Sequence, residues 1–311
     1  MPELSIIVST RNRADSLRLT LEAFGRVNVP NGWIVELLVV DNGSTDHTHA
    51  VVNEAGLNTI TLRYLNEPKT GLSNARNAGL AAANGEVLLF TDDDVVPAED
   101  WMERMAGPLL RRECEGVMGQ VRLADDLLRP WMNQDHKRAL AISGDAANEG
   151  KELIGANMGL LRLIFERIPG FDPELGAGAS GFGEETLLTW QMDKAGFRLK
   201  AVPEAFVVHY PDASRLVRSQ WLKAAHQRGV SQAYILHHWQ HAELRLPSVR
   251  YYYLLAKLWL RRILQPPPSL DEEGCPPWEM SYLAEMALCR QFIEERKRPR
   301  KYTRHGFQKK I

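Results

Sequence analysis

The chain has 311 residues, of which 44% are hydrophobic, so it is long enough to bury a substantial core in one large domain with an appendage. Its 38 basic and 39 acidic side chains give a net charge of −1, and this balance argues against nucleic acid as a partner. The three cysteines, Cys114, Cys275 and Cys289, are too far apart to suggest a disulfide framework or a zinc motif.

The N-terminal residues 1–10 lack the basic start, long apolar segment and cleavage site of a signal peptide. No apolar run reaches the length of about 18 residues that a spanning helix needs. The sequence therefore predicts a cytoplasmic protein without a spanning helix. Peripheral attachment to the inner face of a membrane stays open.

Short apolar, β-branched runs alternate with helical patterns over the first hundred residues, which is typical of a parallel sheet covered by helices. The predicted strands are residues 4–9, 34–40, 60–65 and 86–91. The predicted helices are residues 15–24, 45–55 and 72–83, with Asp15 and Ser44 as N-caps. The pattern predicts an α/β sandwich.

Polar residues follow three of these strands directly. Thr10, Arg11 and Asn12 follow the first, Asp41 follows the second, and the run 92–94 follows the fourth. Ligands of open α/β sheets bind beyond the carboxyl ends of the strands. We therefore expect all these side chains along one rim of the sheet.

The run Asp92, Asp93 and Asp94 concentrates negative charge at one strand end. Such clustering is repulsive unless a cation lies nearby, and oxygen ligands of this kind suit Mg²⁺ or Mn²⁺ bridged to a diphosphate. The alternative is that Asp94 only caps the helix beginning near Pro97 while the other two carboxylates are solvated.

Asp41 and Arg76 each have two interpretations. Asp41 is placed to accept hydrogen bonds from a base or ribose, or it holds the turn at residues 42–44. Arg76 follows Gly71 at the start of a predicted helix, where the helix N-terminus and the guanidinium suit donor phosphates. Arg76 is otherwise an ordinary surface residue.

The second part of the chain is mixed. We expect a strand at 116–123, a polar, helix-prone stretch up to Gly150, a helix at 184–194 after a glycine-rich segment, and a strand at 199–208 that ends at His209. A domain boundary is predicted near Pro211. Helices follow, with breaks at the prolines of 266–268 and 276–277.

Four segments together resemble family 2 glycosyltransferases in their order and spacing: residues 5–13, 39–46, 71–77 and 91–94. The resemblance covers about residues 1–210 and implies a GT-A fold, a nucleotide-diphosphate sugar donor, a divalent metal and inversion at the anomeric carbon. It also implies a nucleotide-binding half at 1–115 and an acceptor-binding half at 116–210, ahead of a helical region at 211–311.

The resemblance also implies roles for single residues. The nucleotide side is assigned to Thr10, Arg11, Asn12, Asp41, Arg76, Asp92 and Asp93, and the metal to Asp94, Asp92 and His209. Residues 183–185 resemble the family's Gly-Glu-Asp element, so Glu185 is the expected general base, with Glu184 as the other candidate. An ordinary acidic helix start is the alternative. Asn157 and Trp101 are expected on the acceptor side.

The C-terminal region raises two questions about membranes. Apolar residues from Tyr251 to Trp259 recur at helical spacing beside basic ones, which fits either an interfacial helix or a helix packed on the catalytic domain. The basic segment 296–301 either meets anionic lipid or is a solvated, flexible end.

The sequence thus predicts an inverting transferase that moves sugar from a nucleotide-diphosphate donor to a carbohydrate or lipid-linked acceptor, in polysaccharide or glycoconjugate synthesis. A sugar-phosphate nucleotidyltransferase is a second enzyme class, but residues 10–13 contain no glycine for the phosphate loop it needs. A nucleotide-sugar-binding assembly protein without turnover is the third candidate.

Overall fold

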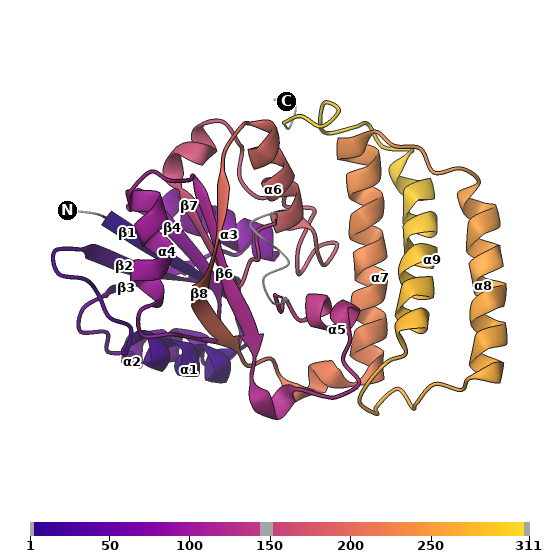
Figure 1. Ribbon diagram of the computed structural model, residues 1–311, viewed down its shortest axis with the longest axis horizontal. Coiled ribbons are helices and arrows are strands. Elements are labelled where there is room, and N and C mark those ends of the chain that lie inside the picture. The colour runs from indigo at the N-terminus through magenta and orange to yellow at the C-terminus, as the bar shows by residue number, and fades with distance from the viewer. Residues whose placement is uncertain (1–2, 144–151, 308–311) are drawn as a thin grey trace.

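The computed structural model describes residues 3–143 and 152–307. Within them, eight strands form one mixed sheet, and three long helices stand beside it (Figure 1). The strands are β1 (Glu3–Thr10), β2 (Ile34–Asp41), β3 (Thr61–Asn66), β4 (Val87–Asp92), β5 (Val95–Pro97), β6 (Gly116–Leu123), β7 (Asn157–Leu161) and β8 (Leu199–His209).

The helices are listed here in chain order for reference in Figure 1. The α-helices are α1 (Ala14–Phe24), α2 (Thr48–Glu54), α3 (Leu72–Ala82), α4 (Trp101–Leu110), α5 (Gln134–Ala139), α6 (Glu184–Lys194), α7 (Arg218–Ile235), α8 (Pro247–Leu264) and α9 (Pro277–Glu295). The short 3₁₀ turns are η1 (Asp125–Leu127), η2 (Arg162–Glu166) and η3 (Ala213–Leu216), and η4 (Leu236–Gln240) is a π-helical turn that continues α7.

The sheet has the order β3-β2-β1-β4-β7-β6-β8-β5. Strands β1 to β4 run parallel, and β7 is antiparallel to both β4 and β6. The register pairs Thr10 with Asp41 and Ser9 with Asp92. The carboxyl ends of β1, β2 and β4 therefore meet at one rim, as the sequence predicts.

Apolar side chains on both faces of the sheet are covered by helices. On β1, Ile6 and Val8 face a core shared with α1, α2 and α4, whereas Ile7 faces a core shared with α3 and α6. Because both faces are buried, residues 6–8 of β1, 37–40 of β2 and 87–90 of β4 are consecutive apolar residues instead of alternating with polar ones. The predicted α/β sandwich is confirmed.

The two predicted helix caps are wrong, and one residue replaces both. The side chain of Asp46 accepts hydrogen bonds from the backbone N–H of Ala14 (3.1 Å) and of Thr48 (3.1 Å), so it stabilises the first turns of both α1 and α2. Asp15 lies inside α1, and Ser44 lies in the turn before α2. The helix α2 begins three residues later than predicted.

Helix α9 lies between α7 and the outermost helix α8 (Figure 1). Its buried Glu279 accepts hydrogen bonds from Arg218 of α7 (2.8 Å) and from Arg262 of α8 (2.7 Å). One carboxylate thus ties three helices together. The predicted proline breaks are confirmed, because 266–268 lies in the loop after α8 and Pro277 begins α9.

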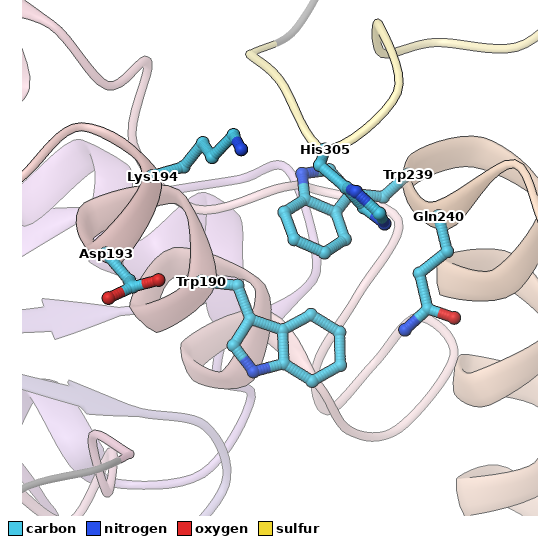
Figure 2. A pocket seen from close by; sticks show the side chains of 6 residues that line it. All are labelled: Trp190, Asp193, Lys194, Trp239, Gln240 and His305. Atoms are coloured by element: carbon cyan, nitrogen blue, oxygen red, sulfur yellow. The ribbon is translucent and has the colours of Figure 1, made fainter.

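The C-terminal helical region contacts the α/β part of the chain at helix α6. Trp190 of α6 stacks on Trp239 of η4, with ring centroids 5.2 Å apart and an interplanar angle of 30° (Figure 2). Asp193, Lys194, Gln240 and His305 complete the lining of a surface hollow of about 330 Å³ around this pair. The aromatic contact fixes α6 from the side of the C-terminal region.

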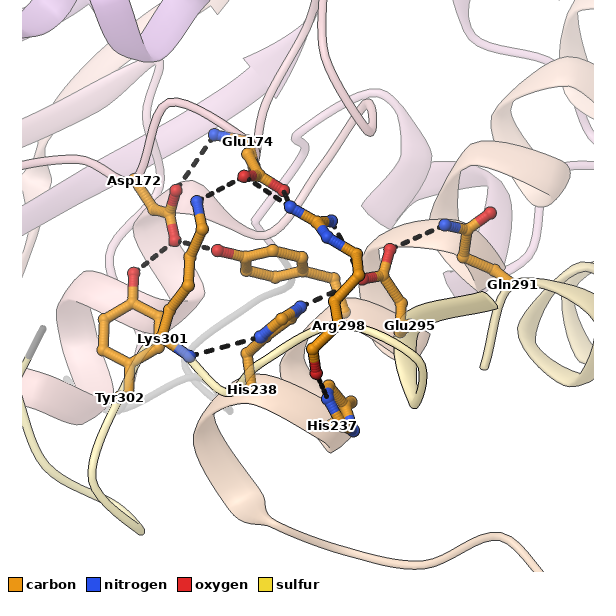
Figure 3. A network of polar contacts seen from close by, with 10 residues as sticks. Asp172, Glu174, His237, His238, Gln291, Glu295, Arg298, Lys301 and Tyr302 are labelled. Atoms are coloured by element: carbon orange, nitrogen blue, oxygen red, sulfur yellow. Dashed lines mark hydrogen bonds and ion pairs between the residues drawn. The ribbon is translucent and has the colours of Figure 1, made fainter. Parts of the chain in front are cut away.

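The basic segment 296–301 is held to the protein at two of its residues. Arg298 pairs with Glu174 (2.7 Å), Lys301 pairs with the same carboxylate, and the buried Tyr302 donates its hydroxyl to Asp172 (Figure 3). Arg296, Lys297 and Arg300 are exposed, so the segment is partly solvated and is anchored at its end. Residues 308–311 lie outside the described residues, as does the end of the polar stretch before Gly150.

Glu295 provides a test of this packing. The carboxylate is buried, and burial alone would raise its pKa. Hydrogen bonds from His238 (2.9 Å) and Gln291 (2.6 Å) and the charge of Arg298 outweigh burial and lower the pKa to about 2. The ionised group therefore stabilises the folded state above its unfolded pKa of about 4.3, and this contribution is lost as the pH falls toward about 2.

We predict that Glu295→Gln removes this pH dependence. Between about pH 5 and pH 3, the free energy of unfolding of the wild type should fall by about 1 to 3 kcal/mol more than that of the variant. Urea unfolding at several pH values measures the difference. Glu294→Gln is the control, because that neighbouring side chain is exposed and forms only a surface pair with Lys297.

Candidate functional site

Two acidic side chains after β4 share one arginine. Arg13 donates to Asp93 (2.6 Å) and to Asp94 (2.5 Å), and Thr10 donates its hydroxyl to Asp93 (2.6 Å). Burial raises the pKa of Asp93 to about 7, even though the charge of Arg13 acts in the opposite direction. Asp93 is thus held by groups of the protein itself.

Asp94 has one oxygen that faces His209, at the place where a metal is expected. This Oδ1 is buried and lies 3.2 Å from Nε2 of His209, and among the described residues it has no other close polar partner. Burial disfavours the charge, but His209 and Arg13 outweigh it and hold the pKa of Asp94 below its usual range.

Asp94 and His209 suit a divalent cation that takes its other ligands from a diphosphate and water. The two side chains come from strand ends far apart in the sequence, at β4 and β8. Among the described residues, no three His, Cys, Asp or Glu side chains form a metal site by themselves. The fit therefore requires the ligand's own oxygens.

Arg76 connects this cluster to the second pair of carboxylates. Its buried guanidinium lies 3.6 Å from Asp92 Oδ1 and 3.0 Å from Glu184 Oε1. Gly155 makes the contact possible, since a Cβ at that position would collide with both Arg76 and Glu185. Arg76 is not the ordinary surface residue that was the alternative in the sequence.

The two glutamates at the start of α6 lie in different environments. Glu184 is buried, and burial together with the nearby Glu185 raises its pKa well above the usual range, although Arg76 opposes this shift. Glu185 is partly exposed, and its carboxylate accepts a long hydrogen bond from the N–H of Gly155 (3.3 Å). Of the two carboxylates, Glu185 is the more accessible to an incoming hydroxyl.

The turn after β2 is tied to the turn after β1. Asp41 accepts hydrogen bonds from the N–H of Ser44 (2.8 Å) and the hydroxyl of Tyr64 (2.8 Å), so it holds its own turn. Asn12, with a positive φ of 51°, accepts from the N–H of Thr45 (2.7 Å). Arg11 is exposed at the edge of the same rim.

Trp101 and Asn157 do not face an acceptor. Both are fully buried, and the indole N–H of Trp101 donates to Asn157 Oδ1 (2.8 Å). Asn157 donates in turn to the backbone oxygens of Gln120 and Ala205. The expectation of an acceptor-side role is corrected: these side chains join β6, β7 and β8 inside the fold.

Two arginines of the site have no assigned role in the sequence analysis. Arg13 holds Asp93 and Asp94. In the sequence, it is marked only by its place in the polar segment that follows β1. Arg215 of η3 is half-buried near the same acidic side chains; burial lowers its pKa, and the charges of Asp94 and Asp92 partly compensate. Its distance from the run 92–94 in the sequence conceals this proximity.

These features define a class: an α/β protein of GT-A type with an acidic cluster at the strand ends beside a second pair of carboxylates. The chain matches the family Glycosyl transferase family 2 over residues 5–168. It belongs to that family. The match includes the acidic cluster at 92–94 and ends before Glu184, Glu185 and His209.

Two curated relatives extend this comparison. The chain is 30% identical over 215 residues to the succinoglycan biosynthesis protein ExoM of Rhizobium meliloti, covering 68% of this chain and 67% of the relative. It is 33% identical over 122 residues to the glycosyltransferase AglE of Haloferax volcanii, covering 39% of this chain and 40% of the relative. The chain thus spans between two fifths and two thirds of their lengths.

Solved structures show the same fold. The mannosyltransferase PcManGT from Pyrobaculum calidifontis, solved with GDP-Man and Mn²⁺, superposes with a TM-score of 0.61 at 18% identity, covering 94% of this chain and 87% of its own. TarS from S. aureus superposes with a TM-score of 0.52 at 18% identity, covering 84% of this chain and 43% of its own. The GT-A fold with C-terminal helices is therefore confirmed.

We predict that Arg76→Met destabilises the protein by about 3 kcal/mol, because it leaves the buried Glu184 beside Asp92 without a cation. Urea unfolding gives the value. The matched control is Arg18→Met, whose partner Glu54 is exposed, and it should cost less than about 1 kcal/mol. Equal losses in the two variants would contradict the role of Arg76 as a buried connection.

Proposed function

We propose that the chain is an inverting glycosyltransferase that uses a nucleotide-diphosphate sugar and a divalent metal. The observation that carries the proposal is the order of the side chains across the site. Asp94 and His209, which suit a metal, lie at one end, Asp92 and Arg76 come next, and the accessible Glu185 follows them. The diphosphate is expected at the first end and the acceptor hydroxyl at Glu185.

On the donor side, we propose that the nucleotide lies over the rim formed by Thr10, Arg11, Asn12 and Asp41, with Asp92 at the ribose. Asp93 would act indirectly, since it already accepts from Thr10 and Arg13. Arg215 and Arg13 are cations near the acidic cluster and are suited to the diphosphate. Bound Mg²⁺ or Mn²⁺ would neutralise the charge that develops on the leaving diphosphate.

On the acceptor side, we propose that Glu185 takes the proton of the acceptor hydroxyl. The acceptor oxygen forms a bond to the anomeric carbon as the bond from that carbon to the diphosphate oxygen breaks, and the proton passes to the carboxylate. A single displacement inverts the configuration. Glu184 would serve instead to hold Arg76, as its burial and its hydrogen bond from Arg76 (3.0 Å) suggest.

We propose a carbohydrate or lipid-linked acceptor and a role in polysaccharide or glycoconjugate synthesis; ExoM, named for succinoglycan biosynthesis, supports this class. A cytoplasmic location stays a prediction. A sugar-phosphate nucleotidyltransferase is less favoured, because the residues after β1 hold Asp93 and carry no glycine-rich loop. A binding protein without turnover would have no use for Glu185.

We predict that Glu185→Gln lowers turnover about a hundredfold or more while the donor dissociation constant stays within about threefold, because the amide cannot accept the proton. Turnover with saturating donor and acceptor, together with donor titration, measures both values. Glu184→Gln is the control: the amide oxygen can still accept a hydrogen bond from Arg76, so turnover should remain within about tenfold of the wild type. The reverse result would assign the base to Glu184.

We predict that Asp94→Asn lowers transfer about a hundredfold and weakens Mn²⁺ binding in the presence of the nucleoside diphosphate, since one negative ligand is lost. Calorimetric titration of Mn²⁺ checks the binding independently of turnover. Asp126→Asn, on an exposed turn, should change neither quantity. Full activity of the wild type after chelation would contradict the metal-dependent proposal.

A further inference from the structure

Helix α8 carries apolar side chains on two faces. One face packs on α9, with Leu254 and Leu258 in a cluster with Met286. The other face is exposed and includes Val249, Tyr252, Tyr253, Leu255, Trp259, Leu260, Ile263 and Leu264. A packed helix needs only the first face, so its own packing does not explain the second.

The exposed side chains are large and contiguous. Tyr252, Trp259 and Ile263 recur at spacings of seven and four residues, so they lie above one another along the helix. Trp259 is 67% exposed and Leu264 is 71% exposed. Single exposed apolar residues are normal on a soluble protein, but a contiguous stripe of this kind marks an interaction surface.

The charges of α8 indicate an anionic partner. The helix contains Arg250, Lys257, Arg261 and Arg262 and no acidic residue. Among the described residues, Lys257 and Arg261 have no carboxylate within ion-pair distance, and instead they lie over the rings of Tyr253 (4.6 Å) and Trp278 (4.9 Å). These cations border the apolar stripe and are available to an anionic surface.

A hollow of about 350 Å³ lies beside this border. Lys257, Leu260, Arg261, Leu264, Gln265 and Tyr282 line it. Two cations at the rim and two leucines at the wall suit a lipid phosphate with the beginning of its acyl chains. A second copy of the chain is a poorer occupant, because two α8 helices facing each other would bring like charges together.

We propose that α8 is an interfacial helix that docks the protein on a membrane rich in anionic phospholipid. The apolar stripe enters the boundary between head groups and acyl chains, and Lys257 and Arg261 bind lipid phosphates beside it. In the part of the chain that the structure describes, no helix is long and apolar enough to cross a membrane. The helix α8 stands at the outer edge of the molecule, away from the sheet (Figure 1).

The test is flotation of the full chain with vesicles, without donor or metal. The wild type should bind vesicles of equimolar phosphatidylglycerol and phosphatidylcholine at least about tenfold more tightly than vesicles of phosphatidylcholine alone. Trp259→Ser with Ile263→Ser tests the apolar stripe, and Lys257→Gln with Arg261→Gln tests the charges. Each pair should weaken binding to the anionic vesicles about tenfold or more.

The controls distinguish binding through α8 from non-specific hydrophobic or electrostatic binding. Leu19→Ser removes an apolar side chain of similar exposure on α1, and Lys297→Gln removes a cation outside α8. Both should bind like the wild type, and unchanged melting temperatures show that all variants are folded. Glu185→Gln should also bind vesicles like the wild type. Vesicle binding and transferase activity are therefore tested separately, and either proposal can fail without the other.

Two results would overturn the proposal. The first is that the folded wild type does not bind anionic vesicles, or that the α8 variants bind these vesicles as tightly as the wild type. The second is self-association of the wild type in light scattering that Trp259→Ser with Ile263→Ser abolishes, without vesicle binding, because the stripe would then be an interface between copies.

Discussion

The buried guanidinium of Arg76 is the contact on which the geometry of the site depends. It lies between Asp92, at the end of a central strand, and Glu184, at the start of α6. Carboxylates in a desolvated site repel one another unless a cation is shared between them. With Arg76 in place, the strand end that carries Asp92 and the start of α6 are held together, and Glu185 lies beside the same contact.

The acidic cluster follows the same rule on the other side of Asp92. Three consecutive carboxylates are tolerated because Arg13 pairs with two of them and Thr10 donates to the middle one. Asp93 and Asp94, adjacent in sequence, have pKa values shifted in opposite directions, because Asp94 has His209 beside it. The protein thus presents one ionised carboxylate with a free oxygen where the metal is proposed to bind.

The C-terminal region contains a basic segment and an exposed apolar helix that have different roles in the structure, and composition alone does not distinguish these roles. Arg298 and Lys301 pair with Glu174, and Tyr302 donates to Asp172, in the loop that leads to α6 (Figure 3). Besides the face of α8 that packs on α9, a second face of apolar and aromatic residues is exposed. The segment near residue 300 supports the loop before α6, and α8 supplies the exposed apolar surface. Hydropathy alone suggests the opposite arrangement.

The sequence by itself determined the parallel half of the sheet, because local apolar runs and polar strand ends are sufficient to specify it. The common rim of Thr10, Asp41 and Asp92 follows from parallel pairing in register. Only the tertiary structure decided the partners across the site. Arg76 and Glu184 are 108 positions apart, and Thr10 and Asp93 are 83 apart. The burial of Trp101 and Asn157 is equally a product of packing. Local sequence patterns carry no information about contacts that form only when distant segments meet in a desolvated interior. Those contacts decide which acidic or basic side chains are paired within the protein and which can bind a ligand.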